Sequence, residues 1–200
     1  MIVAIPLDIL FIALAVSSGN GLDDPNLAAR IKKGDHSAFK DLFDLHHAEL
    51  YRYLVSRKVP GNIAEDLVQQ AFVKIWEMRS DINEDLSLRA YLFRIAYTRM
   101  LNHFRDQAKF DDSGDIPDTA GSTVLRADSA TQQREIREAI AKALETLPER
   151  RRAVFELCFL KEFSYKETAE ALEISVKTVE NHMGHALKAM RKALAYMKDE

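Results

Sequence analysis

Apolar residues recur at helical spacing along almost the whole chain, and no alternating stretch is long enough to predict a β-strand. Between Asp35 and the PGN sequence at 60–62, one apolar side of a helix is formed by Phe39, Leu42, Phe43, His46, Leu50, Tyr53 and Leu54. Residues 63–78 and 88–107 continue the same spacing on either side of a polar loop, 79–87. The pattern therefore predicts an all-α fold.

Local signals indicate where the helices begin. Asp35 precedes one helical segment, and Ser164 and Ser175 precede two later ones, each in a position suited to an N-cap. Asn62, followed three residues later by Glu65, predicts a capping box. Pro148 predicts the start of a further helix over residues 149–160.

The composition changes between two helical parts of the chain. Residues 109–132 contain five aspartates, two glycines and a proline, carry a net charge of −3 and show no sustained periodicity. These properties predict a flexible acidic linker. We therefore expect two small helical domains, residues 23–108 and 133–200, preceded by an atypical apolar extension at 1–22.

The extension lacks the features of a complete signal peptide. The first basic residue is Arg30, after the apolar run, and Pro6 and Asp8 interrupt that run. The run is also shorter than the roughly 18 apolar residues of a spanning helix. We expect a start assigned too far upstream or a small docking helix, with a targeting or membrane segment as the alternative. The rest of the chain predicts a soluble, cytoplasmic protein.

Charge and cysteine content limit the function classes. The chain has 28 basic and 31 acidic side chains, a net charge of −3, which argues against a free-standing basic nucleic-acid binder. Its one cysteine, Cys158, excludes an internal disulfide framework and is typical of a reducing compartment. The surrounding VFELCFL sequence predicts a buried thiol.

The last two helices form a candidate helix-turn-helix, connected by the short EIS sequence at 173–175. In the second helix the expected buried face consists of Val179, Met183, Ala186, Leu187, Met190 and Leu194. The opposite face carries hydrogen-bonding groups and cations, from Lys177, Thr178, Asn181, Gly184, His185 and Lys188. Such groups suit contacts with base edges and phosphates, although an ordinary solvated helix face is the alternative.

A second candidate for nucleic-acid binding lies on the helix at 88–107. Its polar stripe consists of Arg94, Thr98, Asn102, Arg105 and Lys109. Aromatic residues alternate with these basic groups, an arrangement that suits single-stranded nucleic acid because rings stack on bases and cations follow phosphates. Amphipathic core packing with solvated arginines would give the same pattern.

Two longer stretches resemble a known family. AEDLVQQAFVKIWE (64–77), followed by LRAYLFRIAYTRMLNHFRDQ, closely resembles region 2 of bacterial RNA polymerase sigma factors. The stretch from LETLPERRR to HALKAMRKAL resembles their region 4, and the two-domain organisation resembles the extracytoplasmic-function (ECF) group of the sigma-70 family. The resemblance covers about residues 23–196. It implies a sigma factor that binds core RNA polymerase, recognises the −10 and −35 promoter elements and helps to melt DNA.

The resemblance also implies roles for individual residues. The polymerase β′ clamp coiled coil would bind Asp66, Gln69 and Gln70, and the β flap would be a second polymerase contact. Loop 79–87 would capture a flipped base of the non-template −10 strand with Asn83 and Glu84. The backbone or neighbouring bases of that strand would be bound by Arg89, Arg94, Arg99 and Asn102. The −35 duplex would be recognised by Lys177, Thr178, Glu180, Asn181, His185 and Lys188. An anti-sigma factor is an expected partner.

Several residues of the helix-turn-helix depart from the family pattern. Glu173 stands where the family usually has glycine, and many relatives have basic or larger groups at the positions of Glu180, His182, Gly184 and His185. An enzyme is not predicted, because the chain has no phosphate-binding glycine loop, no His-Glu-x-x-His and no cysteine pair. We therefore expect no catalytic residue, cofactor, metal or small-molecule substrate. A LuxR-like helix-turn-helix regulator is the alternative function, and an adaptor that binds no DNA is another.

Overall fold

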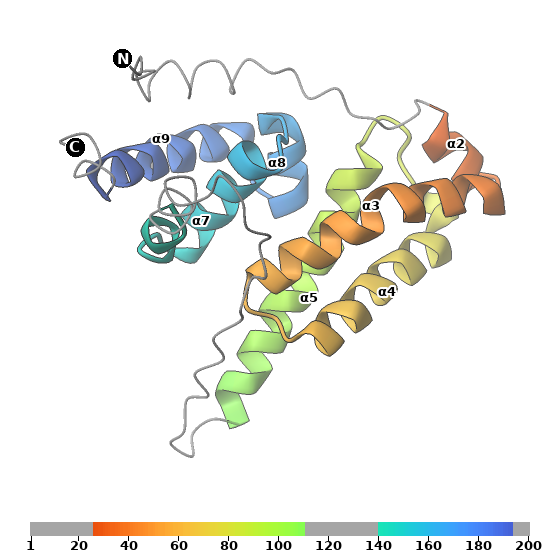
Figure 1. Cartoon of the computed structure of the whole chain (residues 1–200). Helices are drawn as coiled ribbons and strands as arrows, with labels where there is room; N and C mark the ends of the chain where they lie inside the picture. Colours follow the sequence, from red (N-terminus) through yellow and green to blue (C-terminus); the bar gives the residue numbers. More distant parts are fainter. Residues whose placement is uncertain (1–25, 111–139, 194–200) are drawn as a thin grey trace, which may run out of the picture. The chain divides into compact units, whose positions relative to one another are not determined.

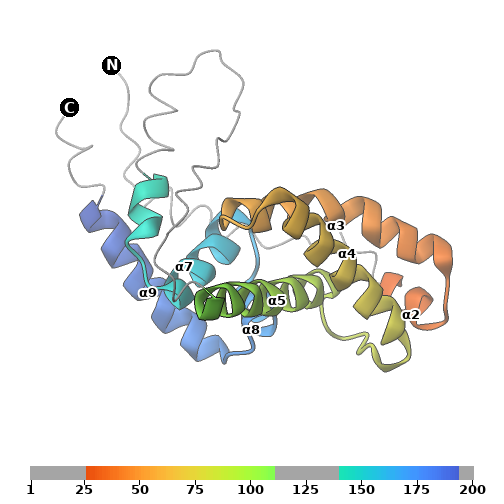
Figure 2. The same cartoon turned by 90° about the horizontal axis from the view of Figure 1, so that it is seen from below.

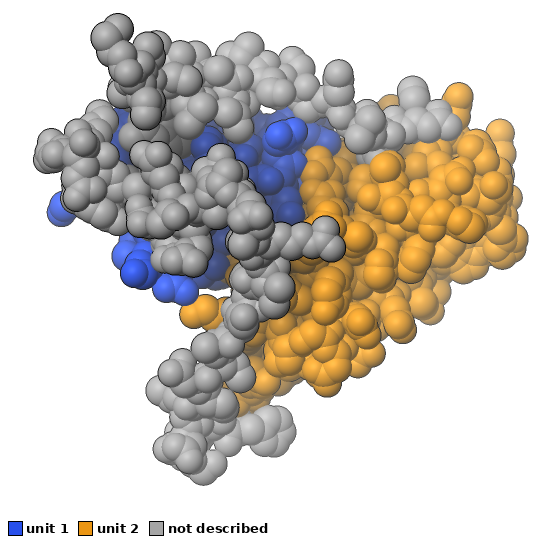
Figure 3. Space-filling view, viewed as in Figure 1, with its two compact units in different colours: residues 1–20, 124–169, 174–200 blue, residues 21–123, 170–173 orange. Residues whose placement is uncertain are grey.

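The computed structural model describes residues 26–110 and 140–193, and every regular element in these two ranges is helical (Figure 1). The all-α prediction is therefore confirmed. The described residues fall into two compact units, one comprising 26–110 with 170–173 and the other 140–169 with 174–193 (Figure 3). The predicted extension at 1–22 and nearly all of the predicted linker lie outside the described residues.

The first unit is a three-helix bundle with a short helix at one end. Helices α3 (His36–Ser56), α4 (Gly61–Glu77) and α5 (Leu88–Phe110) lie side by side in Figure 1 and Figure 2, and each packs against the other two. Helix α2 (Leu27–Lys32) packs on α3 and on the 3-10 turn η1 (Arg79–Asp81). The fully buried side chains of this bundle include Leu42, Leu50, Tyr53, Leu54, Ile75, Leu92, Phe93 and Met100.

The starts of these helices show which capping predictions were correct. The Asp35 carboxylate accepts hydrogen bonds from the backbone N–H groups of Ser37 at 2.8 Å and Ala38 at 3.1 Å, so the predicted N-cap is confirmed. The predicted capping box at Asn62 is wrong, because Pro60 is the N-cap of α4 and no side chain caps that helix. Proline presets a backbone angle suitable for a helix start, and its carbonyl accepts from Ala64 N–H at 2.8 Å. Asn62 therefore already lies inside the first turn.

Residues 140–193 form a helical stretch at 140–145, α7 (Glu149–Phe155), α8 (Tyr165–Leu172) and α9 (Val176–Ala193). Helix α7 packs against α9, and the core includes Val154, Phe155, Leu157, Val179, Ala186 and Met190. The single helix predicted over 149–160 is wrong in one respect. After Phe155 the backbone widens into a π turn, η2 (Glu156–Leu160), in which Lys161 N–H donates to the Glu156 carbonyl at 3.0 Å. A π turn contains one residue more than an α-helical turn. The sequence pattern did not indicate this additional residue, because apolar residues lie on both sides of the turn.

Candidate nucleic-acid and polymerase interfaces

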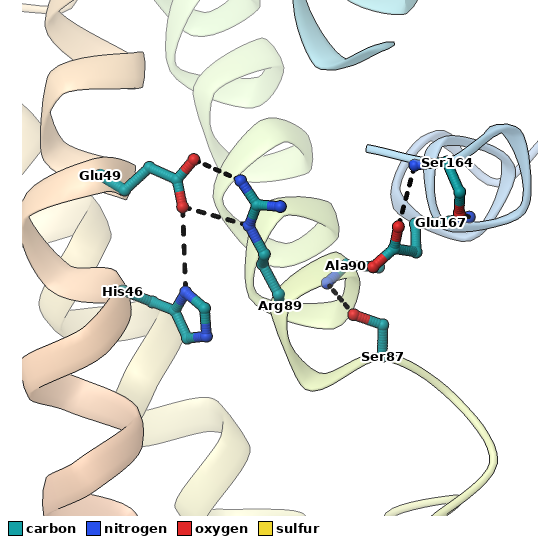
Figure 4. A network of polar contacts seen from close by, with 7 residues as sticks. All are labelled: His46, Glu49, Ser87, Arg89, Ala90, Ser164 and Glu167. Carbon is teal, nitrogen blue, oxygen red and sulfur yellow. Dashed lines mark hydrogen bonds and ion pairs between the residues drawn. The ribbon is translucent and has the colours of Figure 1, made fainter. Parts of the chain in front are cut away.

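Side-chain caps fix the start of both helices in the helix-turn-helix. Ser164 and Glu167 form a complete capping box before α8, with Glu167 N–H donating to Ser164 Oγ at 3.1 Å and Ser164 N–H to the Glu167 carboxylate at 2.9 Å (Figure 4). Ser175 caps α9, since its Oγ accepts from Thr178 N–H at 3.0 Å. Both caps predicted from the sequence are confirmed.

The connection between α8 and α9 contains a left-handed residue. Glu173 has a φ of 53°, and Ile174 N–H donates to the carbonyl of Ala169, five residues earlier, at 3.0 Å. This hydrogen bond and the left-handed residue before it define a Schellman C-cap, in which glycine is usually preferred. Glu173 therefore occupies this turn at a backbone cost that glycine would not carry.

Helix α9 has one buried side and one exposed polar side. Of the predicted buried face, Val179, Met183, Ala186 and Met190 are buried, Leu187 is only half-buried, and Leu194 lies outside the described residues. The exposed side includes Lys177, Glu180, Asn181, Gly184, His185 and Lys188. Within this side Lys177 Nζ lies 2.9 Å from the Glu180 carboxylate, and the half-buried Thr178 places its Oγ1 2.8 Å from Ser175 Oγ. Asn181, His185 and Lys188 are therefore the polar groups best placed to meet a DNA groove.

The predicted polar stripe on α5 is exposed along its whole length. Arg94, Thr98, Asn102, Arg105 and Lys109 all have solvent-exposed side chains. The Arg94 guanidinium carbon also lies 5.8 Å from the centre of the Tyr91 ring. An aromatic ring and a cation therefore stand together at the end of α5 that follows loop 79–87.

Loop 79–87 borders a cavity of about 280 Å³. The cavity is lined by Met78, Asp81, Ile82, Asn83, Leu86, Ser87, Leu88, Tyr91 and Arg94. Asn83 is exposed, and its Oδ1 accepts a hydrogen bond from Asp85 N–H at 3.0 Å. Apolar walls beside an aromatic ring, an amide and a cation form a surface suited to a planar polar ring.

Arg89 makes a different type of contact from the one predicted for it. Its guanidinium forms two hydrogen bonds to Glu49 of α3, Nη2 to Oε1 at 2.5 Å and Nε to Oε2 at 3.1 Å (Figure 4). His46 Nδ1 lies 3.8 Å from the same carboxylate. Arg89 thus connects α5 to α3, and its predicted contact with DNA stays a prediction.

The residues predicted to contact polymerase lie together on α4. Asp66, Gln69 and Gln70 line a recess of about 280 Å³ with Val73, Lys74, Glu77 and Arg99. Arg99 Nη1 donates to Gln70 Oε1 at 2.5 Å, so Arg99 lies beside the candidate polymerase surface rather than on the exposed stripe of α5. The sequence interpretation missed Val73, whose side chain is 54% exposed. Its position three residues after Gln70 and four after Gln69 was the available signal.

Residues 42–110 match the family model described as Sigma-70 region 2, and residues 137–190 match the model described as Sigma-70, region 4. Together the two matches cover more than half of the chain. The chain belongs to the sigma-70 family. Membership implies binding to core RNA polymerase and promoter-directed initiation of transcription, and the first of the two compact units corresponds to region 2 and the second to region 4.

Similar proteins place this sigma factor in the ECF group. It is 28% identical over 178 residues to the ECF RNA polymerase sigma-E factor of Escherichia coli strain K12, covering 84% of this chain and 93% of that protein. It is 26% identical over 176 residues to the ECF RNA polymerase sigma factor SigW of Bacillus subtilis strain 168, covering 82% and 93%.

Solved structures have a similar fold. CnrH, solved in complex with the cytosolic domain of CnrY, matches with a TM-score of 0.63 and 27% identity, covering 86% of this chain and 97% of CnrH. The sigma factor RpoE of Bartonella quintana, solved with the anti-sigma factor NepR, matches with a TM-score of 0.64 and 23% identity, covering 78% and 96%. Among the residues that the structure describes, no helix has the length and apolarity needed to cross a bilayer.

Proposed function

We propose that this chain directs core RNA polymerase to promoters by binding the −10 element with region 2 and the −35 element with region 4. The observation that carries the proposal is the presence of both regions in one chain. A LuxR-like regulator, the alternative function, gives no account of residues 42–110, which match sigma region 2.

In region 2, loop 79–87 takes up one flipped base of the non-template −10 strand in the cavity beside Asn83. The combination of Tyr91, Arg94 and Asn83 around this cavity supports the proposal, since flipped bases are held by stacking and by hydrogen bonds to their polar edge. Arg94 and Asn102 on the exposed stripe of α5 then contact the backbone or neighbouring bases of the same strand. Glu84, the next residue of the loop after Asn83, is the other candidate contact with the flipped base. Arg89 is left out of the contact set because its guanidinium is bonded to Glu49 and its side chain is only 17% exposed.

The exposed side of α4 docks on the β′ clamp coiled coil of polymerase through Asp66, Gln69, Gln70 and Val73. An exposed apolar side chain among polar lining residues supports this assignment, because protein interfaces combine a desolvated apolar part with a polar rim. Arg99 supports Gln70 from the adjacent helix. Region 4 in turn contacts the β flap.

In region 4, α9 enters the major groove of the −35 element. Asn181 and His185 contact base edges, Lys188 contacts a phosphate, and Thr178 lies near the start of the helix, where a recognition helix meets the bases. The Lys177 ammonium beside Glu180 lowers the local cost of an acidic group near DNA phosphates. Glu180 therefore contributes selection rather than affinity.

The free protein binds DNA weakly, and holoenzyme binds promoters tightly. A chain with a net charge of −3 gains little affinity from counterion release, whereas polymerase supplies the basic surface. An anti-sigma factor is a further proposed partner. This partner is motivated by the RpoE structure, which was solved with the anti-sigma factor NepR.

Run-off transcription with purified core polymerase tests the proposal. We expect promoter-specific transcripts from core enzyme plus this protein, and none from core enzyme alone. Asp66→Lys should remove activity and core binding, whereas Glu65→Lys, at an exposed neighbour that does not line the recess, should retain both. Activity only with an already complete holoenzyme would contradict a sigma function and support a regulator.

A further inference from the structure

Lys32, at the end of α2, makes two contacts with the loop that borders the cavity. Its Nζ donates to the Ile82 carbonyl at 3.1 Å and lies 3.4 Å from the Glu84 carboxylate. Ile82 and Glu84 are the two neighbours of Asn83, so one lysine holds the backbone before Asn83 and the side chain after it. The contact spans 50 positions of sequence and lies entirely within region 2.

Helix α2 is itself held firmly against the bundle. Leu27, Ala28 and Ile31 are buried, and α2 packs on both α3 and η1. The turn after α2 passes through Gly34, with a φ of 84°, where an added Cβ would lie 3.8 Å from Arg79 Nε. The ammonium group of Lys32 therefore extends to the loop from a packed helix.

The base of the loop is fixed as well. Arg79 Nη1 donates to the Trp76 carbonyl at 2.8 Å, and its guanidinium lies 4.6 Å from the centre of the Trp76 ring. Ile82 is 5% exposed and anchors the start of the loop in the core. Beyond Ile82, residues 83–86 are exposed, and Lys32 contacts this segment from α2 through the Glu84 carboxylate.

We propose that Lys32 is a positioning residue for base selection at the −10 element: it holds residues 82–84 so that Asn83 faces the captured base, without contacting DNA itself. The inference rests on the proposed function of the loop. Asn83 uses its Oδ1 within the loop to accept from Asp85 N–H, which leaves its amide nitrogen as the donor for a base. A base is selected through hydrogen bonds only when the donor is held in place before binding.

The effect expected from losing Lys32 is moderate. The side chains of Lys32 and Glu84 are 40% and 48% exposed, and exposed ion pairs are weak. The hydrogen bond from the ammonium to a backbone carbonyl adds a charge-assisted contact. Together these contacts support a loss of base selectivity of about three- to tenfold rather than a complete loss.

The test measures binding of reconstituted holoenzyme to −10 non-template oligonucleotides that carry each of the four bases at each position. We expect Lys32→Met to reduce the base preference at one position about three- to tenfold. The base preferences at the other positions should stay as in wild type. Lys33→Met is the matched control, because it removes the same charge from the exposed next residue and should keep the wild-type preference. Lys32→Arg should restore part of the preference.

Asn83→Ala separates this inference from the proposed function. If wild-type holoenzyme has a preferred base and Asn83→Ala does not alter it, the proposed capture by the loop fails. If Asn83→Ala removes the preference but Lys32→Met behaves like Lys33→Met, the positioning role alone is overturned.

A direct phosphate contact by Lys32 has a different signature. Lys32→Met would then weaken binding equally for all four bases and lower the salt dependence by about one unit, which overturns the inference. Thermal unfolding establishes that each variant is folded. If Lys32→Met does not fold, Lys32→Ala, which also removes the charge and the donor, takes its place with the same expected loss of preference.

Discussion

Arg89 of α5 and Glu49 of α3 form a two-point ion pair whose side chains are only 17% and 19% exposed (Figure 4). The pair lies at the start of α5, where Ser87 caps the helix by accepting from Ala90 N–H at 3.2 Å. It therefore fixes the first turn of the helix that carries the candidate −10 stripe. Arg89, which lies in a helix of alternating arginines and aromatic residues, therefore joins α5 to α3.

Replacing Arg89 with Met should lower the free energy of unfolding of region 2 by about 2–3 kcal/mol, because Glu49 would keep its charge without the guanidinium. Arg105→Met, at an exposed position of the same helix, should change it by less than about 0.5 kcal/mol. Urea unfolding followed by circular dichroism measures both. The double variant Arg89→Met, Glu49→Met should recover part of the loss, and an equal loss for Arg89 and Arg105 would contradict this account.

The helices were predictable from the sequence because their information is local. Spacing of apolar residues predicts α3, α4 and α5, and single side chains such as Asp35, Ser164 and Ser175 predict where helices begin. The partners of Arg89 and Arg99 were not predictable, because Glu49 and Gln70 lie 40 and 29 positions away. Periodicity places an arginine on one side of a helix but does not say which neighbouring helix packs there.

Glu173→Gly should stabilise the helix-turn-helix by about 1 kcal/mol relative to Glu173→Ala. Both variants remove the same carboxylate, but only glycine adopts the left-handed φ of 53° at little cost. The difference between the two unfolding free energies therefore isolates the backbone contribution. Equal stability of the two variants would show that this turn carries no strain.

The Cys158 thiol should make folding sensitive to alkaline pH. Burial raises its pKa from the ordinary 9.0 to about 11, while a contact of 3.2 Å with Thr168 Oγ1 acts in the opposite direction. Because the folded pKa is the higher one, this stabilisation is complete below pH 9 and is lost as pH rises towards 11, by up to about 2–3 kcal/mol. Wild type should lose stability against Cys158→Ala over that interval, measured by urea unfolding at each pH. A constant difference between the two proteins would contradict the shift.

The contribution of Lys188 to the affinity of holoenzyme for −35 DNA should be independent of the DNA sequence. Its exposed ammonium lies on the polar side of α9, where we expect it to meet a phosphate. Lys188→Ala should weaken holoenzyme binding by a similar factor for all −35 sequences and reduce the slope of log affinity against log salt by about one. Titrations at several salt concentrations measure this slope. A loss confined to one −35 sequence would show that Lys188 contacts a base instead.

Asn181 should instead determine the preference at one base pair of the −35 element. Its amide is exposed one turn into α9 and combines a donor with an acceptor, the combination that pairs with the adenine edge in the major groove. Asn181→Ala should cost about 1–3 kcal/mol on the preferred sequence and much less on sequences changed at that pair, with an unaltered salt slope. Competition binding of holoenzyme to a library of −35 variants measures the preference at every position. Lys188→Ala is the control for a general loss of affinity. If Asn181→Ala has the same base preference as wild type at every position, Asn181 takes no part in base recognition. His185 and Glu180 are then the residues of α9 that select the sequence.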